Sequence, residues 1–381
     1  MTVPSTTRAT PPRTTRPIPQ MQPWIGEEER RAINEYLEAG GWLTDFQRTR
    51  EFEQAIAAYV GSRHASVVSN GTASLFIALK TLGIGPGDEV IVPDYSMIAS
   101  ANAVLLAGGT PRLVDIDRTT LCLDLNLAEQ AITTRTKAIM IVSVNGRAPD
   151  MNRALELARA KGIPLIEDAA QSLGSRWHGR HLGTFGEIGC FSFSAPKVIT
   201  TGQGGALVTD RDDLIETVRR LRDFGRPKDG VDQHDTVGYN FKFTDLQAVI
   251  GLAQMAKLEW RVQRKKEMFA LYRRGLADVP EVTFVETNLD ETSPWFMDLL
   301  APDPIALQAY LTERGIGSRL FYPPIHTQAP YHLQERFSEA EHASRHGLWL
   351  PSASFLDDET IEWICAEIQA FFKGRAGGSG P

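Results

Sequence analysis

The stretch Cys190-Phe-Ser-Phe-Ser-Ala-Pro-Lys197-Val-Ile-Thr-Thr-Gly-Gln-Gly-Gly205 is the most informative part of the sequence. Its first five residues alternate small and aromatic side chains, which is typical of a half-buried strand, and Pro196 then ends ladder pairing and starts a turn. The glycines that follow allow tight turns before Ala206–Asp210, which we interpret as a second strand. Lys197 is therefore predicted at the mouth of a strand, among small residues that leave room for a ligand.

A lysine at such a place has two interpretations. Most lysines are solvated surface residues that have no role in chemistry. A lysine becomes a nucleophile when its amine is partly desolvated or lies near positive charge, because its pKa then falls toward the working pH. The second interpretation of Lys197 needs partner residues elsewhere in the chain.

Strands and helices alternate on both sides of the opening stretch. We predict strands at 65–69, 89–93, 111–115, 138–144 and 164–167, and helices at 75–82, 96–107, 127–132, 151–161 and 210–222. Such alternation favours an α/β fold with a mostly parallel sheet. Ligands bind such sheets beyond the carboxyl ends of the strands, where we expect Thr72, Tyr95, Asn145, Asp168 and Lys197 to lie.

Two of these positions carry chemistry of their own. Asn70-Gly-Thr-Ala-Ser74 opens a helix, so free backbone N–H groups and the helix dipole predict an anion site, although ordinary N-capping explains it as well. Asp168 ends an apolar strand, and helix capping would again suffice. What distinguishes the interpretations is the pairing of Asp168 with Lys197, because a pyridoxal phosphate enzyme needs an acid on its pyridine nitrogen and a lysine on its aldehyde.

The second half of the chain predicts a smaller α+β domain. Residues 227–237 are polar and turn-rich and are predicted to form a mobile loop, and a long helix then continues from about 245 to 274. Strands are predicted at 282–285, 295–300 and 317–321, and helices at 304–314 and 358–372. We expect a disordered tail over 1–18, a large domain over 19–240, a linking helix and small domain over 241–373, and a flexible tail over 374–381.

Composition excludes several classes of function. The chain has 381 residues and a formal net charge of −7, which argues against nucleic acid or an anionic membrane as a partner. Its three cysteines lack the spacing of a disulfide framework or a zinc site, so no metal is expected. No apolar run of 18 residues and no secretion signal are visible, so a cytoplasmic protein is expected. A nicotinamide dehydrogenase is disfavoured because no GxGxxG follows the early strands.

Four motifs together carry a resemblance to a known family. They are Asn70-Gly-Thr-Ala, Glu167-Asp-Ala-Ala-Gln, Ser192-Phe-Ser-Ala-Pro-Lys with its glycine-rich continuation, and Gly238-Tyr-Asn-Phe-Lys-Phe-Thr-Asp-Leu-Gln-Ala. In this order, over roughly residues 20–373, the chain resembles the DegT/StrS-type nucleotide-sugar aminotransferases. The resemblance implies a fold-type I pyridoxal phosphate enzyme, with a mixed, mostly parallel seven-stranded sheet in a large domain and a small C-terminal α+β domain.

The resemblance also implies roles for individual residues. Lys197 would be joined covalently to pyridoxal phosphate and, once displaced, would act as the general base. Asp168 would pair with the pyridine nitrogen, and Gln171 would lie near the 3-oxygen of the ring. Asn240 would reach the cofactor phosphate of a neighbouring subunit, which implies a homodimer with shared active sites, either alone or as half of a dimer of dimers. The remaining cofactor-binding residues would be Gly71, Thr72, Ala73, Met97 and Ser192.

The implied reaction transfers the amino group of L-glutamate to a keto sugar nucleotide. A 4-keto-6-deoxyhexose is expected, in the manner of perosamine synthases, and a lysine where a sister group has histidine favours transamination over dehydration. An alternative acceptor is a 3-keto sugar nucleotide or a keto-cyclitol. An alternative of another class is a non-catalytic regulator that binds pyridoxal phosphate.

Two departures from the family pattern affect the predicted substrate pocket. Met97 stands where relatives usually carry an aromatic residue over the cofactor ring, and Tyr95 is a possible substitute. The second departure is Ser143-Val-Asn-Gly-Arg147, where relatives commonly carry a histidine and an aromatic residue before the glycine, so Asn145 and Arg147 are expected to reshape the sugar pocket. Arg226 is expected to form a salt bridge. The candidate substrate residues are Trp42, Thr44, Tyr95, Asn145, Arg147, Arg319 and His326.

Overall fold

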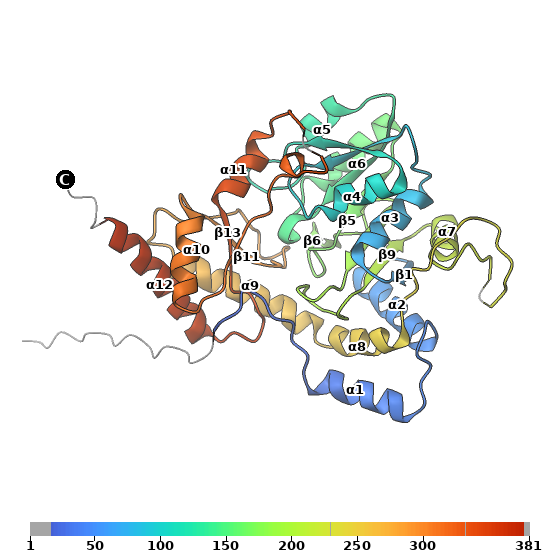
Figure 1. The fold of residues 1–381 in the computed structure, drawn as a ribbon, viewed down its shortest axis with the longest axis horizontal. Helices are drawn as coiled ribbons and strands as arrows, with labels where there is room; N and C mark the ends of the chain where they lie inside the picture. The colour runs from blue at the N-terminus through green and yellow to red at the C-terminus, as the bar shows by residue number, and fades with distance from the viewer. Residues whose placement is uncertain (1–16, 229, 332, 377–381) are drawn as a thin grey trace, which may run out of the picture.

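The computed structural model describes residues 17–228, 230–331 and 333–376 (Figure 1). The predicted tails at 1–18 and 374–381 lie mostly outside these ranges, and the structure differs from each prediction at one end. Ile18 is buried, and its backbone pairs with Ile316 of the small domain. Helix α12 (Asp358–Ala376) continues past residue 374. Composition alone did not reveal that one apolar residue near the polar N-terminal segment packs into a core.

The large domain is built on a seven-stranded sheet, which confirms the predicted fold class. Its strand order is β1-β9-β8-β5-β4-β2-β3, and only β9 runs against its neighbours. Residues of β2 are buried on both faces, as expected for a parallel sheet that helices cover on each side. The bounds are β1 (His64–Val68), β2 (Glu89–Pro93), β3 (Thr110–Val114), β4 (Thr136–Val142), β5 (Leu165–Asp168), β8 (Ile188–Ser192) and β9 (Gly205–Thr209).

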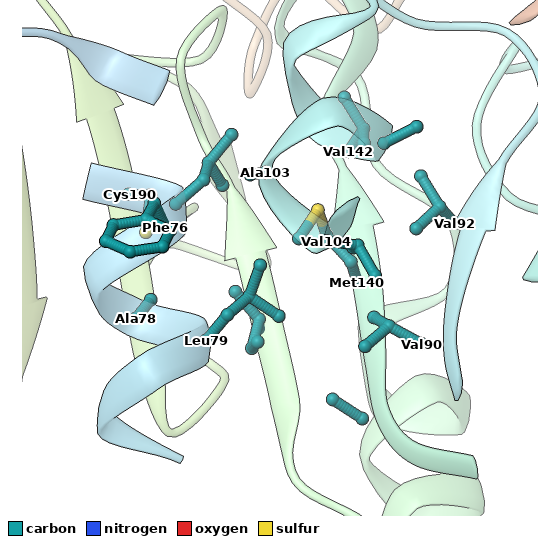
Figure 2. Close-up of a cluster of buried hydrophobic side chains, with 14 of the residues drawn as sticks. Phe76, Ala78, Leu79, Val90, Val92, Ala103, Val104, Met140, Val142 and Cys190 are labelled. Carbon is teal, nitrogen blue, oxygen red and sulfur yellow. The ribbon is translucent and has the colours of Figure 1, made fainter. Parts of the chain in front are cut away.

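Helices pack against both faces of this sheet. Successive residues of β2 point to opposite faces, so Val90 and Val92 contact one set of helices while Ile91 contacts another. Figure 2 shows Leu79 directed from α3 toward the sheet, in the cluster that also holds Phe76, Val90 and Val92. On this face lie α3 (Gly71–Thr81), α4 (Ala99–Ala107) and α7 (Asp212–Arg222), and on the other α5 (Leu125–Ala131) and α6 (Met151–Lys161), with α2 (Gln47–Val60) beside β1.

The small domain packs a second sheet against long helices. Figure 1 shows it on the left, joined to the large domain through α8 and α9. Its antiparallel sheet has the order β10-β11-β13-β12. The strands are β10 (Thr283–Phe284), β11 (Met297–Leu300), β12 (Arg319–Leu320) and β13 (Gly347–Leu350), and the helices that pack with them are α9 (Leu258–Gly275), α10 (Pro304–Glu313) and α12. Helix α11 (Ser338–His346) packs instead into the cluster of the large domain that contains α3 and α4.

The prediction of one helix through residues 245–274 is wrong. The structure has α8 (Asp245–Met255) and α9, separated by Ala256 and Lys257. At this break the Lys257 amine lies 2.6 Å from the carboxylate of Glu29, which is fully buried near the start of α1 (Glu27–Glu38). The break thus accompanies the ion pair that attaches α1 to the rest of the protein.

An N-terminal segment, residues 17–26, links the two domains. The carbonyl of Ile18 accepts a hydrogen bond from the Gly317 N–H at 2.7 Å, and that of Gln20 accepts one from the Ser352 N–H at 2.8 Å. Further along, the carbonyl of Trp24 accepts from the Arg261 guanidinium on α9 at 2.8 Å. The segment is therefore hydrogen-bonded first to the small domain and then to the linking helix.

Glu167 on β5 provides a prediction about stability. Its carboxylate is fully buried and accepts backbone N–H groups from Gly183, Phe185 and Gly186 at 2.5–2.7 Å. We expect Glu167→Gln to lower the free energy of unfolding by about 2–3 kcal/mol, because the amide has one oxygen where the carboxyl has two, so at least one of the three buried N–H groups loses its acceptor. Urea denaturation followed by circular dichroism measures this loss.

The control variant for this prediction is Glu187→Gln. Glu187 is partly exposed and pairs with Arg211 across 3.0 Å, so its replacement should change stability by less than about 1 kcal/mol. Equal losses in the two variants would contradict the proposed importance of the buried carboxylate.

Candidate active site

The predicted site residues lie where the parallel strands end. Asp168 is the last residue of β5, and Lys197 follows β8 in the glycine-rich loop. Tyr95 follows β2, and Asn145 lies in the short 3-10 turn Val144–Gly146 after β4. Of these residues, Asp168 and Lys197 interact electrostatically. This edge of the sheet is the candidate active site.

Asp168 is held by hydrogen bonds in a buried position. Its Oδ2 accepts from the Ser100 hydroxyl at 2.6 Å, and its Oδ1 accepts from the Ala170 N–H at 3.2 Å. Loss of water raises the pKa of this carboxyl, while Ser100, Ala170 and Lys197 counteract the rise. Ser100 was not predicted, because nothing in its sequence neighbourhood distinguishes it from other small residues of α4.

Lys197 carries an amine with altered acidity. Burial lowers the pKa of Lys197 to about 8, and the neighbouring Asp168 carboxylate counteracts part of that shift. The Nζ atom lies 3.9 Å from the ring centroid of Trp295, a buried residue 98 positions further along the chain. Trp295 was missed by the sequence analysis, since only the tertiary fold brings it to Lys197.

The lowered pKa predicts how Lys197 reacts in the protein without cofactor. Only the neutral amine is nucleophilic, so its reactivity should rise about tenfold per pH unit up to about pH 8 and level off above it. Competitive reductive methylation from pH 6 to 11, with mass spectrometry of the Lys197 peptide, measures this curve. The exposed Lys137 is the internal reference. A Lys197 curve that coincides with that of Lys137 would contradict the prediction.

The start of α3 forms a small cradle beside Ser192. Asn70 caps the helix through its Oδ1, which accepts the Ala73 N–H at 2.9 Å. The N–H groups of Gly71 and Thr72 precede the first intrahelical hydrogen bond, so they suit an anion. A Cβ at Gly71 would lie 2.9 Å from the Ser192 Cβ, so only glycine lets the helix start approach this serine.

The candidate residues Trp42 and Thr44, in the loop between α1 and α2, are exposed, whereas Tyr95 is buried. Trp42 is 63% exposed and donates its indole N–H to the Thr44 hydroxyl at 2.8 Å. Met97 is 46% exposed, so its side chain is available to a ligand. Tyr95 is fully buried, with its ring centroid 5.9 Å from that of Phe321. The structure therefore places Met97, rather than Tyr95, at an accessible position.

Asn145 holds β11 against the large domain. Its backbone is left-handed, with φ of 53°, which asparagine tolerates better than most residues. Its side-chain oxygen accepts the Phe296 N–H at 2.6 Å, and its side-chain nitrogen donates to the Phe296 carbonyl at 2.9 Å. Its own N–H donates to the Gln171 Oε1 at 2.8 Å. The Asn145 amide is thus engaged with protein groups.

Arg147 has a similar structural environment. Its guanidinium is buried, pairs with Asp298 at 2.7 Å and donates to the Thr120 carbonyl at 2.9 Å. Arg147 and Asp298 thus form a buried ion pair, and removing either partner is expected to lower the stability of the protein strongly. The predicted substrate contacts of Asn145 and Arg147 therefore compete with contacts that join the two domains.

The other candidates differ in accessibility. His326 is buried, with its Nδ1 2.7 Å from the Asp94 carboxylate. Arg319 is exposed, and its guanidinium lies 5.4 Å from the ring centroid of Tyr322 and 5.6 Å from that of Trp349. Asn240 is exposed and its backbone pairs with Asp223.

Arg226 forms the predicted salt bridge, with Asp232, at 2.7 Å. In the described part of the chain, no group of three or more histidine, cysteine or acidic side chains is arranged to hold a metal ion. None of the helices described there has the length and apolar character that crossing a bilayer requires.

Comparison with known proteins identifies the family. The model of the DegT/DnrJ/EryC1/StrS aminotransferase family matches residues 23–369. The chain belongs to this family.

This DegT/DnrJ/EryC1/StrS aminotransferase has close relatives among named proteins. It is 35% identical to the GDP-perosamine synthase of Escherichia coli O157:H7 over 364 residues, which cover 94% of this chain and 99% of the relative. It is 33% identical to the GDP-perosamine synthase of Vibrio cholerae over 363 residues, covering 93% and 99%.

The chain is also similar to solved structures over most of its length. DesV of S. venezuelae has a TM-score of 0.87 and 33% identity, covering 91% of this chain and 94% of DesV. The PLP form of the putative sugar aminotransferase Spr1654 of Streptococcus pneumoniae has a TM-score of 0.88 and 26% identity, covering 94% and 99%.

The family's cofactor is pyridoxal phosphate, and the residues at the strand edge fit it. The donor set includes a buried acid for the ring nitrogen, an amine for the aldehyde carbon, and a helix start for the phosphate. A Cβ at Gly71 would lie 3.1 Å from the Ser192 hydroxyl oxygen, so this hydroxyl is close to the start of α3. The aminotransferase therefore has groups suited to each end of this cofactor.

Proposed function

We propose that the enzyme transfers the amino group of L-glutamate to the keto carbon of a nucleotide-linked 4-keto-6-deoxyhexose. The observation that carries the proposal is that Asp168 ends β5 and Lys197 follows the neighbouring parallel strand β8, so both residues lie at the edge of the sheet where α/β enzymes bind ligands. The similarity to two GDP-perosamine synthases over nearly their whole length supports the choice of acceptor.

Each residue has a definite task in this proposal. When bound, pyridoxal phosphate supplies an electron sink that stabilises negative charge on the carbon that loses a proton. Lys197 anchors the cofactor and, when displaced, moves the proton with its Nζ. Asp168 keeps the ring nitrogen protonated, and the hydrogen bond from Ser100 fixes the direction of its carboxylate. Gly71, Thr72 and Ser192 bind the phosphate.

Arg319 is a candidate for binding the acidic part of a substrate. Its guanidinium is exposed and lies over the rings of Tyr322 and Trp349, and no carboxylate pairs with it among the described residues. The ring centroid of Trp349 lies 6.4 Å from that of Trp295, which in turn lies 3.9 Å from the Lys197 Nζ, so Arg319 lies near the site. A guanidinium suits the diphosphate of a sugar nucleotide because it binds two oxygens at once.

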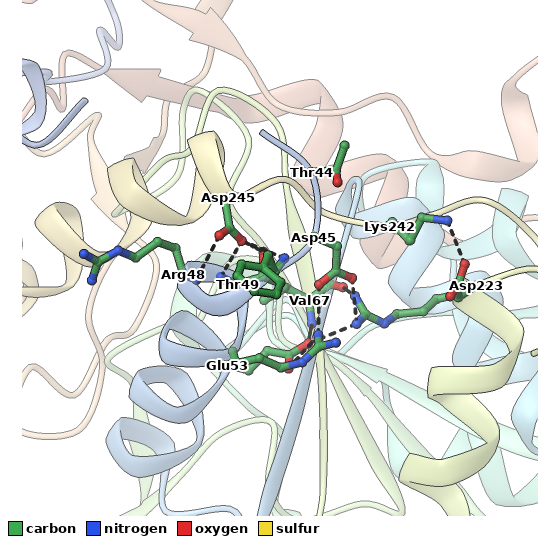
Figure 3. Close-up of polar contacts among 12 residues, drawn as sticks. Thr44, Asp45, Arg48, Thr49, Glu53, Val67, Asp223, Lys242 and Asp245 are labelled. Carbon is green, nitrogen blue, oxygen red and sulfur yellow. Dashed lines mark hydrogen bonds and ion pairs between the residues drawn. The ribbon is translucent and has the colours of Figure 1, made fainter. Parts of the chain in front are cut away.

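The proposal includes a homodimer in which Asn240 reaches the partner's cofactor phosphate. Trp42, Leu43 and Phe46 are each more than half exposed, which suits a surface that a second copy of the chain covers. Figure 3 shows the polar contacts of Asp45 and Asp245 that hold this loop in place. The buried Arg222 pairs with Asp45 at 2.9 Å, and Asp245 accepts the Phe46 N–H at 2.9 Å.

Light scattering tests the dimer. We expect a mass of twice 42.1 kDa for the wild type and one closer to a single chain for Leu43→Asp, because a charge in an apolar interface is costly. Leu127→Asp, at another exposed leucine, is the control. A monomeric wild type would contradict the shared site.

Absorbance tests the reaction. We expect the purified enzyme with pyridoxal phosphate to show a yellow band that L-glutamate removes and that a 4-keto-6-deoxyhexose nucleotide restores. Nucleotides of 3-keto sugars and keto-cyclitols form the comparison panel, and restoration by one of them instead would replace the proposed acceptor. A band that responds to no amine donor would favour a non-catalytic regulator.

A further inference from the structure

The loop that carries Lys197 is held in place by side chains from distant parts of the sequence. The carbonyl of Pro196 accepts the indole N–H of Trp295 at 2.6 Å. The carbonyl of Val198 accepts from the Arg261 guanidinium on α9 at 3.0 Å. The backbone is therefore held on both sides of Lys197, at Pro196 and at Val198, by residues of the linking helix and the small domain.

Trp295 also contacts the reactive atom itself. The Lys197 Nζ lies 3.9 Å from the centroid of the indole ring, which is within the range of a cation–π contact. Trp295 is only 3% exposed, so little water screens this contact. An aromatic face stabilises the protonated amine and not the neutral one, and it thus opposes the effect of burial on Lys197.

Lys265 fixes the position of Trp295 by a hydrogen bond to its backbone carbonyl. Lys265 lies on α9, is fully buried, and donates from its Nζ to the Trp295 carbonyl at 3.0 Å and to the Ser352 carbonyl. Burial, together with the nearby Arg261, lowers the pKa of Lys265 to about 7. On the other side, the ring of Phe296 stacks on Trp295 with centroids 3.9 Å apart.

These contacts give Trp295 a role in the proposed reaction. Lys197 must leave the cofactor in every turnover, carry a proton and return. We propose that the indole face of Trp295 is where the Lys197 amine rests while it is not bonded to the cofactor, and that Lys265 is a positioning residue that acts through Trp295. The inference rests on the proposed role of Lys197.

The effect of Trp295 on the pKa of Lys197 must be measured separately from the effects of the charged groups around the amine. Asp168 is the carboxylate that acts on Lys197, and the Tyr322 hydroxyl in turn interacts with Asp168. Arg261 and Lys265 approach from α9, but their contacts are to the backbone carbonyls of Val198 and Trp295. A change at Trp295 thus leaves the charges around Lys197 unaltered.

The test measures the pKa of Lys197 in the full chain without cofactor, by competitive reductive methylation. We expect Trp295→Leu to lower that pKa by about 0.5–1.5 units, because leucine keeps the site apolar but cannot stabilise the ammonium. Trp295→Phe should give a smaller fall in the same direction, and it decides the matter if the leucine variant does not fold. Trp260→Leu, at an exposed tryptophan on α9, should leave the curve unchanged.

A double-mutant cycle tests Lys265. Lys265→Met should lower the Lys197 pKa by less than Trp295→Leu does. Adding it to Trp295→Leu should produce no further fall, since Lys265 acts through the indole. In the loaded enzyme, kcat should fall about 10- to 100-fold in Trp295→Leu with little change in the KM for the acceptor.

The outcomes separate this inference from the proposed function. If the wild type forms no yellow band with pyridoxal phosphate, the proposed role of Lys197 falls. If the wild type forms the band while both Trp295 variants keep the wild-type pKa of Lys197, or raise it, the resting place on Trp295 is refuted alone. Additive effects of Lys265→Met and Trp295→Leu would refute the positioning role of Lys265.

Discussion

Lys197→Ala is expected to lower kcat for transamination by about 10³-fold or more. The variant loses both the covalent anchor of the cofactor and the group that moves the proton, and alanine supplies neither. The cradle at Gly71, Thr72 and Ser192 is intact in this variant, so it should still bind pyridoxal phosphate noncovalently. The measurement is steady-state transamination, together with the absorbance of the cofactor-loaded protein, from which the yellow band should be absent.

A lysine outside the site provides the matched control. Lys80→Ala removes a partly buried lysine that donates to the carbonyls of Ile84 and Ala107 at the end of α3, so it should affect stability and not kcat. An active Lys197→Ala enzyme would refute the assignment of Lys197. Equal loss of activity in both variants would point instead to a general loss of folding.

Asp168→Asn is expected to lower kcat/KM by about 10²- to 10³-fold. The amide has nearly the shape of the carboxylate and can still accept the hydrogen bond from Ser100, but it has no charge to keep the ring nitrogen protonated. Because the Asp168 carboxylate raises the pKa of Lys197, its loss should shift the methylation curve of Lys197 to lower pH. Kinetics and the methylation curve together check both effects.

Ser100→Ala separates the charge of Asp168 from its orientation. This variant keeps the carboxylate and removes the 2.6 Å hydrogen bond, so we expect a smaller loss of kcat/KM, about tenfold. If Asp168→Asn retains full activity, the acid is only a structural cap. If Ser100→Ala is as impaired as Asp168→Asn, the direction of the carboxylate matters as much as its charge.

Local patterns in the sequence were sufficient to predict the sheet and the edge at which Asp168 and Lys197 lie. The alternation of strands and helices predicted the parallel core, and the motifs around Asp168 and Lys197 predicted an edge at which both would lie. The strand β13 was missed, as was the hairpin of β6 (Arg176–Trp177) and β7 (Arg180–His181), because these are short or wholly buried segments without clear alternation. Helix α11 was also missed.

What the sequence could not supply is the direction of side chains and their distant partners. Asn145 was expected at the right edge, yet only the tertiary structure shows its amide engaged with Phe296. Trp295 and Ser100 lie far along the chain from the residues they contact, so no spacing predicts them. The residue types around Lys197 were therefore predictable, but the contacts that tune its amine were not.

The N-terminal segment has a consequence for how the enzyme takes in its substrates. Many two-domain enzymes open their clefts by a hinge rotation of one domain. Here, residues 17–26 act as a tether, because the same short segment is hydrogen-bonded to Gly317 and Ser352 of the small domain and, through the Trp24 carbonyl, to Gln254 on α8, which packs against α1 and α2. A wide rotation of the small domain would have to break these bonds, so we expect this segment to restrict such a motion.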